Sequence, residues 1–337
     1  MECLHMKKHN FAFDIIKLFA ITTIVIHHSG LLQGVLVRGY IWVEFFFITS
    51  GYLLYSSFKK NSSSNTLQHL KKRILRVYPE YFASWFLIFL FMLIASGKFP
   101  YENIVQMILE IFMMQSIGLP FGGGAINKPL WYLSVMMLAD AIIYIMLRKM
   151  NIRIYRIISI LIIFFTTFTL VSNSSGIEQW GFLHRIMYIP FWRGFSDMLI
   201  GTLIYQLADS NIFRSKILLM IMEIGACISI VTLLFLPGKF DYVCLVVIII
   251  LVISITSEQA ILNRIGDNKI VAFLMKYEYS IYLNHSLVIM VSKKIFSIVS
   301  LPLGIELLVY IVILLEYSCI FQKIITLALG KLKGKEV

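Results

Sequence analysis

Residues 11–30 read FAFDIIKLFAITTIVIHHSG. This stretch is long and apolar enough to enter a bilayer as a helix. It nevertheless contains four ionisable residues, Asp14, Lys17, His27 and His28. A charged side chain at the bilayer centre costs at least about 2.5–3.5 kcal/mol, so ionisable residues inside a span are candidates for function. Lys17 and His28 are eleven residues apart, about three helical turns plus some 20°, so both project from one face. We expect the rest of the chain to enclose that polar face.

The composition predicts a polytopic, all-α membrane protein. The 337 residues are 59% hydrophobic and only 14% charged, whereas a soluble domain carries nearer 25% charged residues. The net charge of +12 is explained by basic residues that accumulate in cytoplasmic loops, so we expect no nucleic-acid partner. The four cysteines are scattered and show neither a disulfide framework nor metal-ligand spacing. We therefore expect no metal site.

About ten segments have the apolar length that a transmembrane helix needs. They lie near 11–30, 40–58, 81–97, 130–147, 157–173, 189–208, 217–236, 242–258, 278–299 and 304–326. With both termini cytoplasmic, this arrangement puts most of the 30 basic residues on the inside.

Segment 104–118 is also apolar, but it is shorter than a transmembrane helix needs to be and carries Glu110. If it crossed, the basic cluster between Arg148 and Arg156 would fall outside, against the usual bias. We therefore predict a short re-entrant or interfacial helix near 104–118.

The second span opens with the sequence WVEFFFITSG from Trp42 to Gly51, which puts Glu44 near the outer end of its helix. His28 also lies near the outer end, roughly 25 Å from Phe11 at 1.5 Å per residue. Only a short connection separates the two helices, so His28 and Glu44 are placed to meet. A carboxylate beside an imidazole would fix its tautomer and support it as a base. The alternatives for Glu44 are a structural charge pair or a side chain that reaches the interface.

Two arginines precede the third span, in the loop sequence KKRILRVYP that runs from Lys71 to Pro79. Arg73 and Arg76 are three residues apart, so on a helix they would project together. Paired guanidinium groups suit phosphate recognition. Ordinary anchoring at the cytoplasmic surface is the alternative.

Taken in order, these motifs resemble membrane acyltransferase family 3, the bacterial integral-membrane acyltransferases that modify surface glycans. The family's first helix carries a basic residue, ten others and then histidine, and here Lys17 and His28 fit that spacing, with lysine in place of the commoner arginine. Further motifs match at Glu44–Gly51, Arg73–Pro79, Pro129–Val135, Arg193–Gly201 and Ser280–His285. Where the family often continues the Pro129–Val135 segment with glutamate, this chain has Met136 and Met137.

The resemblance implies transfer of an acyl group, most often acetyl, from cytoplasmic acetyl-CoA to a hydroxyl of an extracytoplasmic or lipid-linked cell-surface polysaccharide. The protein would act in the bacterial cytoplasmic membrane, in contact with lipid. Arg73 and Arg76 would bind the nucleotide part of the CoA, and the pantetheine arm would pass Lys17. His28, supported by Glu44, would deprotonate the sugar hydroxyl or first accept the acyl group. Residues 1–337 would form one integral-membrane domain with no extra soluble domain.

Three other residues have two interpretations each. Trp131 would stack on a sugar ring or anchor the chain at the membrane surface. Arg193 would grip a substrate from the outside or pair with Asp197 one turn away. His285 would be a satisfied packing histidine or part of the donor site.

A proton-coupled transporter or glycan flippase is the alternative function, since Lys17, His28 and Glu44 are also the buried titratable groups that such a protein needs. No internal repeat or pair of broken helices supports it. A non-catalytic membrane scaffold would leave the polar face without a purpose. The acyl group, the acceptor sugar and the oligomeric state stay open.

Overall fold

The computed structural model describes residues 10–61, 65–99, 104–116, 126–173, 176–179, 181–183, 187–210, 215–237, 239–257, 259–264 and 268–333. Its α-helices are α1 (Phe11–Ser29), α2 (Trp42–Lys60), α3 (Thr66–Ser96), α4 (Ile104–Ile111), α5 (Trp131–Lys149), α6 (Ile152–Asn173), α7 (Ile189–Asp209), α8 (Lys216–Phe235), α9 (Asp241–Ile255), α10 (Lys269–Lys276), α11 (Glu278–Phe296) and α12 (Leu303–Lys333). Short 3-10 helices lie at η1 (Gly39–Ile41), η3 (Lys128–Leu130) and η4 (Ile261–Arg264). The strands of the described residues are two residues each, β1 (Phe182–Leu183) and β2 (Met187–Tyr188), and they pair antiparallel.

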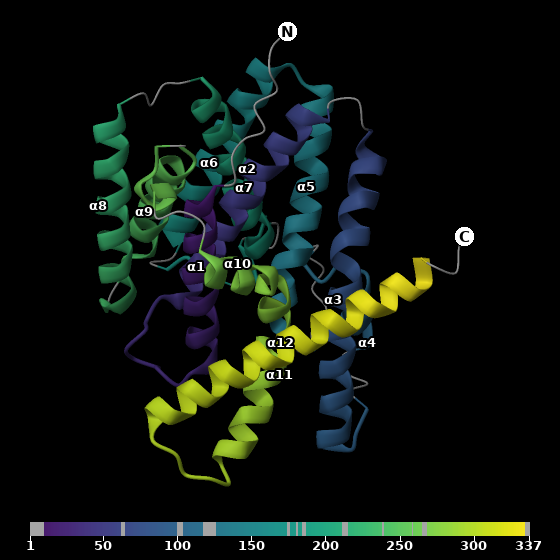
Figure 1. Ribbon diagram of the computed structural model, residues 1–337. Helices are drawn as coiled ribbons and strands as arrows, with labels where there is room; N and C mark the ends of the chain where they lie inside the picture. The colour runs from purple at the N-terminus through teal and green to yellow at the C-terminus, as the bar shows by residue number, and fades with distance from the viewer. Residues whose placement is uncertain are drawn as a thin grey trace.

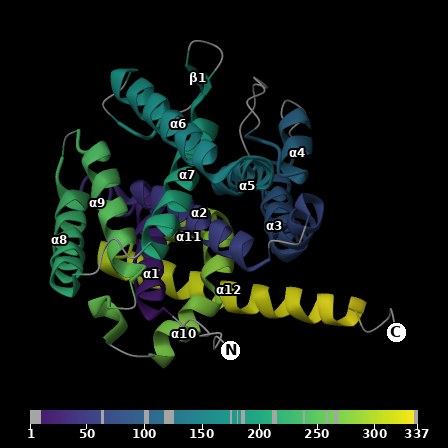
Figure 2. The same cartoon turned by 90° about the horizontal axis from the view of Figure 1, so that it is seen from above.

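The helices form a bundle in which most elements run up or down the long direction of the molecule, while α12 crosses them at a slant (Figure 1). Viewed from above, α12 runs across the molecule (Figure 2) and packs against α11. Six helical segments of the described chain are long and apolar enough to cross a membrane, and they are Phe11–Ser29, Thr66–Ser96, Lys128–Lys149, Ile152–Asn173, Lys216–Phe235 and Leu303–Gly330. The architecture therefore agrees with the prediction of an α-helical membrane protein.

The segment near 104–118 forms a short helix, as the charge pattern predicts. Helix α4 has 8 residues, about 12 Å, and is too short to cross a hydrocarbon core of about 30 Å. Residues 117–118 of the predicted segment lie outside the described part of the chain.

The basic segment before the third span is helical, so the prediction of a loop there is wrong. The side chains of Asn65 and Gln68 form a capping box that starts α3 at Thr66. Helix α3 then continues for 31 residues, past Pro79. At about 46 Å, α3 is longer than the hydrocarbon core is thick. Arg73 and Arg76 lie in its N-terminal part, which can extend beyond the membrane.

Helices α2 and α7 approach each other more closely than side chains would allow. A Cβ atom on Gly51 would lie 1.9 Å from the carbonyl oxygen of Met198, and one on Gly201 would lie 1.9 Å from that of Ile48. Small residues at such contacts are a common device in membrane helix packing, because they let backbones touch. This contact turns the polar residues at the starts of α2 and α7 toward each other.

Candidate active site

The last turn of α1 brings His28 against His285 of α11. Nδ1 of His28 lies 2.9 Å from Nε2 of His285, and the two rings stack with centroids 5.1 Å apart. On its other side, Nδ1 of His285 lies 2.6 Å from the main-chain carbonyl oxygen of Tyr282. His285 is completely buried, whereas His28 is exposed. The pair therefore has one end fixed in the protein interior and one end open.

Glu44 faces α7, and the predicted support of His28 by Glu44 is not what the structure shows. Oε1 of Glu44 lies 2.9 Å from Nε of Arg193, and the carboxyl of Asp197 also contacts Glu44. Glu44 is completely buried. The physical reason is the close contact of α2 with α7, because Gly51 lies two helical turns from Glu44 on the same face. The observed partner of His28 is His285 instead.

Arg193 and Trp131, both predicted to bind substrate, lie together. The guanidinium carbon of Arg193 is 5.0 Å from the centre of the Trp131 ring. Nη1 of Arg193 also donates to the main-chain carbonyl of Ile177 at 2.9 Å. Arg193 is only 4% exposed. Among the described residues it contacts Glu44, Trp131 and Ile177 and forms no ion pair with its helical neighbour Asp197.

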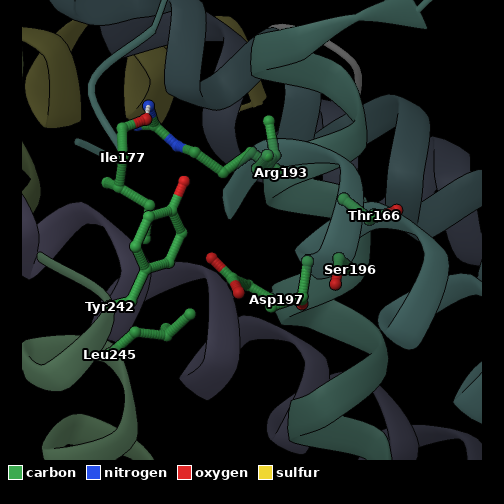
Figure 3. A pocket seen from close by; sticks show the side chains of 9 residues that line it. Thr166, Ile177, Arg193, Ser196, Asp197, Tyr242 and Leu245 are labelled. Carbon is green, nitrogen blue, oxygen red and sulfur yellow. Dashed lines mark hydrogen bonds between the residues drawn. The ribbon is translucent and has the colours of Figure 1, made fainter. Parts of the chain in front are cut away.

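A small cavity opens beside Arg193, between α6, α7 and α9 (Figure 3). Its empty volume is about 250 Å³, including its mouth. Arg193, Asp197 and Tyr242 point into it together with Thr166 and Ser196 (Figure 3). Polar groups from α7 and α9 thus meet in a cavity that also has apolar walls, among them Leu170 and Leu245.

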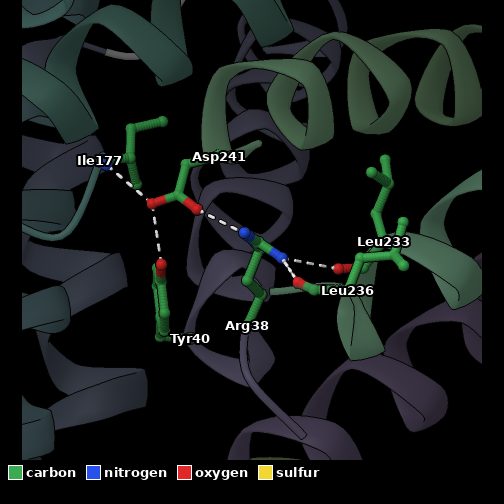
Figure 4. Close-up of polar contacts among 6 residues, drawn as sticks. All are labelled: Arg38, Tyr40, Ile177, Leu233, Leu236 and Asp241. Carbon is green, nitrogen blue, oxygen red and sulfur yellow. Dashed lines mark hydrogen bonds and ion pairs between the residues drawn. The ribbon is translucent and has the colours of Figure 1, made fainter. Parts of the chain in front are cut away.

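A second polar cluster, which the sequence analysis missed, fixes the connection that follows His28 (Figure 4). Nε of Arg38 lies 2.9 Å from Oδ1 of Asp241, and the Tyr40 hydroxyl donates to Oδ2 of Asp241 at 2.8 Å. Arg38 also donates to the carbonyls of Leu233 and Leu236, at the end of α8. The connection between α1 and α2 is thereby tied to α8 and α9. The signal for it in the sequence is one charged residue just before α2 and another at the start of α9, 203 residues apart.

At the other end of the bundle, the two predicted phosphate-binding arginines differ. Nη1 of Arg73 lies 2.7 Å from Oδ1 of Asp140, and Nε2 of His69 lies 2.9 Å from Oδ2 of the same carboxylate. Arg76 is exposed and makes no ion pair with a described residue. Asp140 is completely buried in α5, one turn after the Met136 that stands where the family often has glutamate.

Lys17 lies partly buried on α1 between these two ends. Its charge acts on the carboxyl of Glu278, at the start of α11. Helices α1 and α11 therefore face each other with Lys17 near Glu278 and His28 against His285.

The motif segments that are far apart in sequence meet around His285. The Tyr282 hydroxyl donates to the carbonyl of Pro129 at 2.6 Å. The carbonyl of Leu283 accepts hydrogen bonds from Ser84 at 2.9 Å and from Asn127 at 3.2 Å. The segment that carries His285 is thus fixed by α3 and by residues 127–129, at the start of η3.

Residues 10–321 match the family Acyl_transf_3, described as an acyltransferase domain. The match begins at the N-cap of α1 and reaches into α12, so it includes both histidines of the pair. Neither a curated protein nor a solved structure matches the chain. The match covers nearly the whole chain, and the helical fold contains apolar helices long enough to cross a membrane. The chain therefore belongs to acyltransferase family 3 and is a membrane acyltransferase.

Proposed function

We propose that the protein is a membrane O-acetyltransferase that moves an acetyl group from cytoplasmic acetyl-CoA to a hydroxyl of an extracytoplasmic or lipid-linked cell-surface polysaccharide. The observation that carries the proposal is the His28–His285 pair, in which a buried imidazole supports an exposed one. Such an arrangement provides a base at one end of α1. The basic start of α3 provides positive charge at the opposite end of the bundle, where an anionic donor would bind.

The reaction needs one proton to be held temporarily. The sugar hydroxyl oxygen attacks the thioester carbonyl carbon while Nε2 of His28 takes the hydroxyl proton. The C–S bond then breaks, the acetyl group remains on the sugar oxygen, and the CoA sulfur takes the proton from His28. In the alternative, Nε2 attacks the thioester carbonyl carbon, the C–S bond breaks and the CoA thiolate leaves. The sugar hydroxyl oxygen then attacks the acetyl group, the bond between the acetyl carbon and Nε2 breaks, and the hydroxyl proton passes to the CoA thiolate. Both routes consume and release the same molecules.

The donor would bind through Arg76 and Arg73 with the pantetheine arm passing Lys17. The exposed guanidinium of Arg76 has all its donors available to phosphate among the described residues. Arg73 is oriented by the buried carboxylate of Asp140 and keeps further N–H groups for a ligand. The geometry therefore supports unequal roles, with Arg76 as the main phosphate contact and Arg73 as a fixed neighbour.

On the acceptor side, Trp131 would stack on a sugar ring. Trp131 is partly exposed and the Arg193 guanidinium packs on its ring, which would fix the ring orientation. Glu44 would then act by holding Arg193, not by contacting His28.

The proposed topology has ten spans, cytoplasmic termini and a location in the bacterial cytoplasmic membrane. Helices α2 and α7 run in the same direction, because Glu44 pairs with Arg193 near their starts and Lys59 pairs with Asp209 near their ends. An odd number of crossings must then separate them, and α3, α5 and α6 supply three if α4 does not cross. This supports the arrangement that follows from the positive-inside bias.

The decisive experiment supplies acetyl-CoA labelled in its acetyl group to the purified protein in vesicles, with cell-surface polysaccharide as acceptor. Label should enter the polysaccharide with the wild type and fall to background with His28→Ala. Thr22→Ala, an exposed position on the same helix, is the matched control and should retain activity. Full activity of His28→Ala would remove His28 from the chemistry. Movement of glycan without incorporation of label would instead favour a transporter or flippase.

A further inference from the structure

We propose that His285 is a positioning residue that holds His28 in its Nδ1–H tautomer, so that His28 presents an unprotonated Nε2 at the open end of the pair. This inference deepens the proposed function and rests on it for the catalytic consequence. The tautomer itself follows from the contacts of the two rings and is testable separately.

The direction of the hydrogen bonds follows from the buried end of the pair. A carbonyl oxygen only accepts hydrogen bonds, so Nδ1 of His285, 2.6 Å from the carbonyl of Tyr282, carries a hydrogen. A neutral imidazole has a single N–H, which leaves Nε2 of His285 as an acceptor. The 2.9 Å contact with His28 then requires Nδ1 of His28 to donate. Nε2 of His28 is therefore the nitrogen with the lone pair.

His285 must be neutral for this argument, and its surroundings meet that condition. The residue is completely buried, and among the described residues no carboxylate lies within ion-pair distance of it. A buried imidazolium without a counter-charge is strongly disfavoured. If His285 carried a second proton, it would donate to His28 and the tautomer of His28 would be reversed.

The same hydrogen bond persists through the proposed reaction. When Nε2 of His28 takes a proton, Nδ1 keeps its own hydrogen and continues to donate to Nε2 of His285. The bond then becomes charge-assisted and stronger, so the arrangement stabilises the protonated His28 that forms during transfer. This role corresponds to that of the residue that orients the base in a catalytic triad, with a neutral imidazole in place of a carboxylate.

The protein fixes His285 from several sides, as a positioning residue requires. The Tyr282 hydroxyl is bound to the carbonyl of Pro129, and the carbonyl of Leu283 accepts from Ser84 and Asn127. Two segments of the chain, α3 and residues 127–129, thus hold one turn of α11. None of these contacts involves His28, so they stay in place when His28 changes protonation.

The test combines kinetics with histidine ¹⁵N NMR on the full chain in lipid nanodiscs, the His28 signals being assigned by comparison with His28→Ala. Wild-type His28 should be protonated at Nδ1 and unprotonated at Nε2. His285→Leu removes the hydrogen-bond acceptor, so His28 should become a mixture of its two tautomers. The kcat should fall about 10- to 100-fold, because a general base contributes about 10²–10⁴-fold and only part of that contribution is lost. The KM values for both substrates should change little.

Two further variants separate positioning from packing. His285→Gln keeps a hydrogen-bond acceptor and should restore most of the kcat lost in His285→Leu. Tyr282→Phe removes the hydroxyl but keeps the carbonyl that binds His285, so the His28 tautomer should be unchanged. A wild-type His28 protonated at Nε2, or an unchanged kcat in a folded His285→Leu, would overturn the inference. A protein that transfers no acyl group would overturn the proposed function, while the NMR result would still decide the tautomer.

Discussion

Among single residues, Glu110 is the buried carboxyl that ties α4 to its neighbours. Its Oε2 accepts hydrogen bonds from the Trp85 indole at 2.8 Å and from the main chain of Ile126 at 3.2 Å. Burial raises the pKa of Glu110 to about 7 from an ordinary value of 4.5, although hydrogen bonds from Gln106 and Trp85 oppose the rise. Between these two values the folded protein binds more protons than the unfolded chain. The contribution of Glu110 to stability is therefore greatest below pH 4.5, declines up to about pH 7 and is level above it.

We expect Glu110→Gln to lose this pH dependence, because an amide does not titrate. Relative to wild type, the variant should become more stable as the pH rises from 5 to 7, and the difference should then stay constant. Thermal unfolding of both proteins in the same detergent at pH 5, 6, 7 and 8 measures it. Parallel pH curves for the two proteins would show that Glu110 is ionised throughout.

Arg73 is paired with Asp140 whereas Arg76 is exposed, so we expect a substitution at Arg76 to affect donor binding directly. Arg76→Glu should raise the KM for acetyl-CoA by about tenfold or more with little change in kcat, because it removes binding that is equal in the ground state and transition state. Arg153→Glu, a charge reversal at an exposed position at the start of α6, is the matched control and should leave KM unchanged. An unaltered donor dependence in Arg76→Glu would move the donor site elsewhere.

At the scale of elements, the α2–α7 contact positions Glu44 against Arg193. The backbones touch at Gly51 and Gly201, where any added Cβ would lie within 2 Å of a carbonyl oxygen of the facing helix. A main-chain carbonyl in a helix cannot move aside as a flexible side chain does. A larger residue at either glycine must therefore separate the helices along their length.

We expect Gly51→Leu and Gly201→Leu each to destabilise the protein by about 3 kcal/mol or more, at the upper end of the range for overpacking. The heat stability of the purified proteins measures the effect. Gly225→Leu in α8 is the control, because a Cβ atom at Gly225 would have nothing within 4 Å among the described residues. Wild-type stability in Gly201→Leu would mean that α2 and α7 are not in backbone contact.

Across the molecule as a bundle, the direction of each helix determines on which side of the membrane its first and last residues lie. Because α2 and α7 run in the same direction, α6 ends on the side where α2 starts, so α6 starts on the side where α2 ends and α3 begins. The end of α3 is then on the opposite side. This arrangement separates the basic start of α3, where we propose that the donor binds, from the exposed His28.

Labelling of single cysteines in intact cells tests this topology, with the four native cysteines first replaced. Lys98→Cys, just after α3, should react with an impermeant thiol reagent added outside. Arg153→Cys, at the start of α6, should react only after the membrane is opened, as should Lys60→Cys at the end of α2. Reaction of Arg153→Cys from outside would require that α4 crosses the membrane.

The positions of most long helices, and the helix that carries the polar face, can be predicted from the chain without its tertiary contacts. The segment predicted at 130–147 is α5 at Trp131–Lys149, and the stretch at 11–30 is α1. Apolar length and helical spacing are properties of a continuous stretch of chain, so they are readable without knowledge of its neighbours. The capping box at Asn65 and Gln68 is an equally local signal, and it begins a helix where the sequence analysis expects a loop.

Which polar residues meet depends on how the helices pack. His28 pairs with His285, 257 residues away, while Glu44 turns to Arg193 and Arg38 to Asp241. These pairings depend on which helices are neighbours and on how each helix is rotated about its axis. Packing sets both, through contacts such as the one between the backbones at Gly51 and Gly201, and no local pattern in the chain encodes the result.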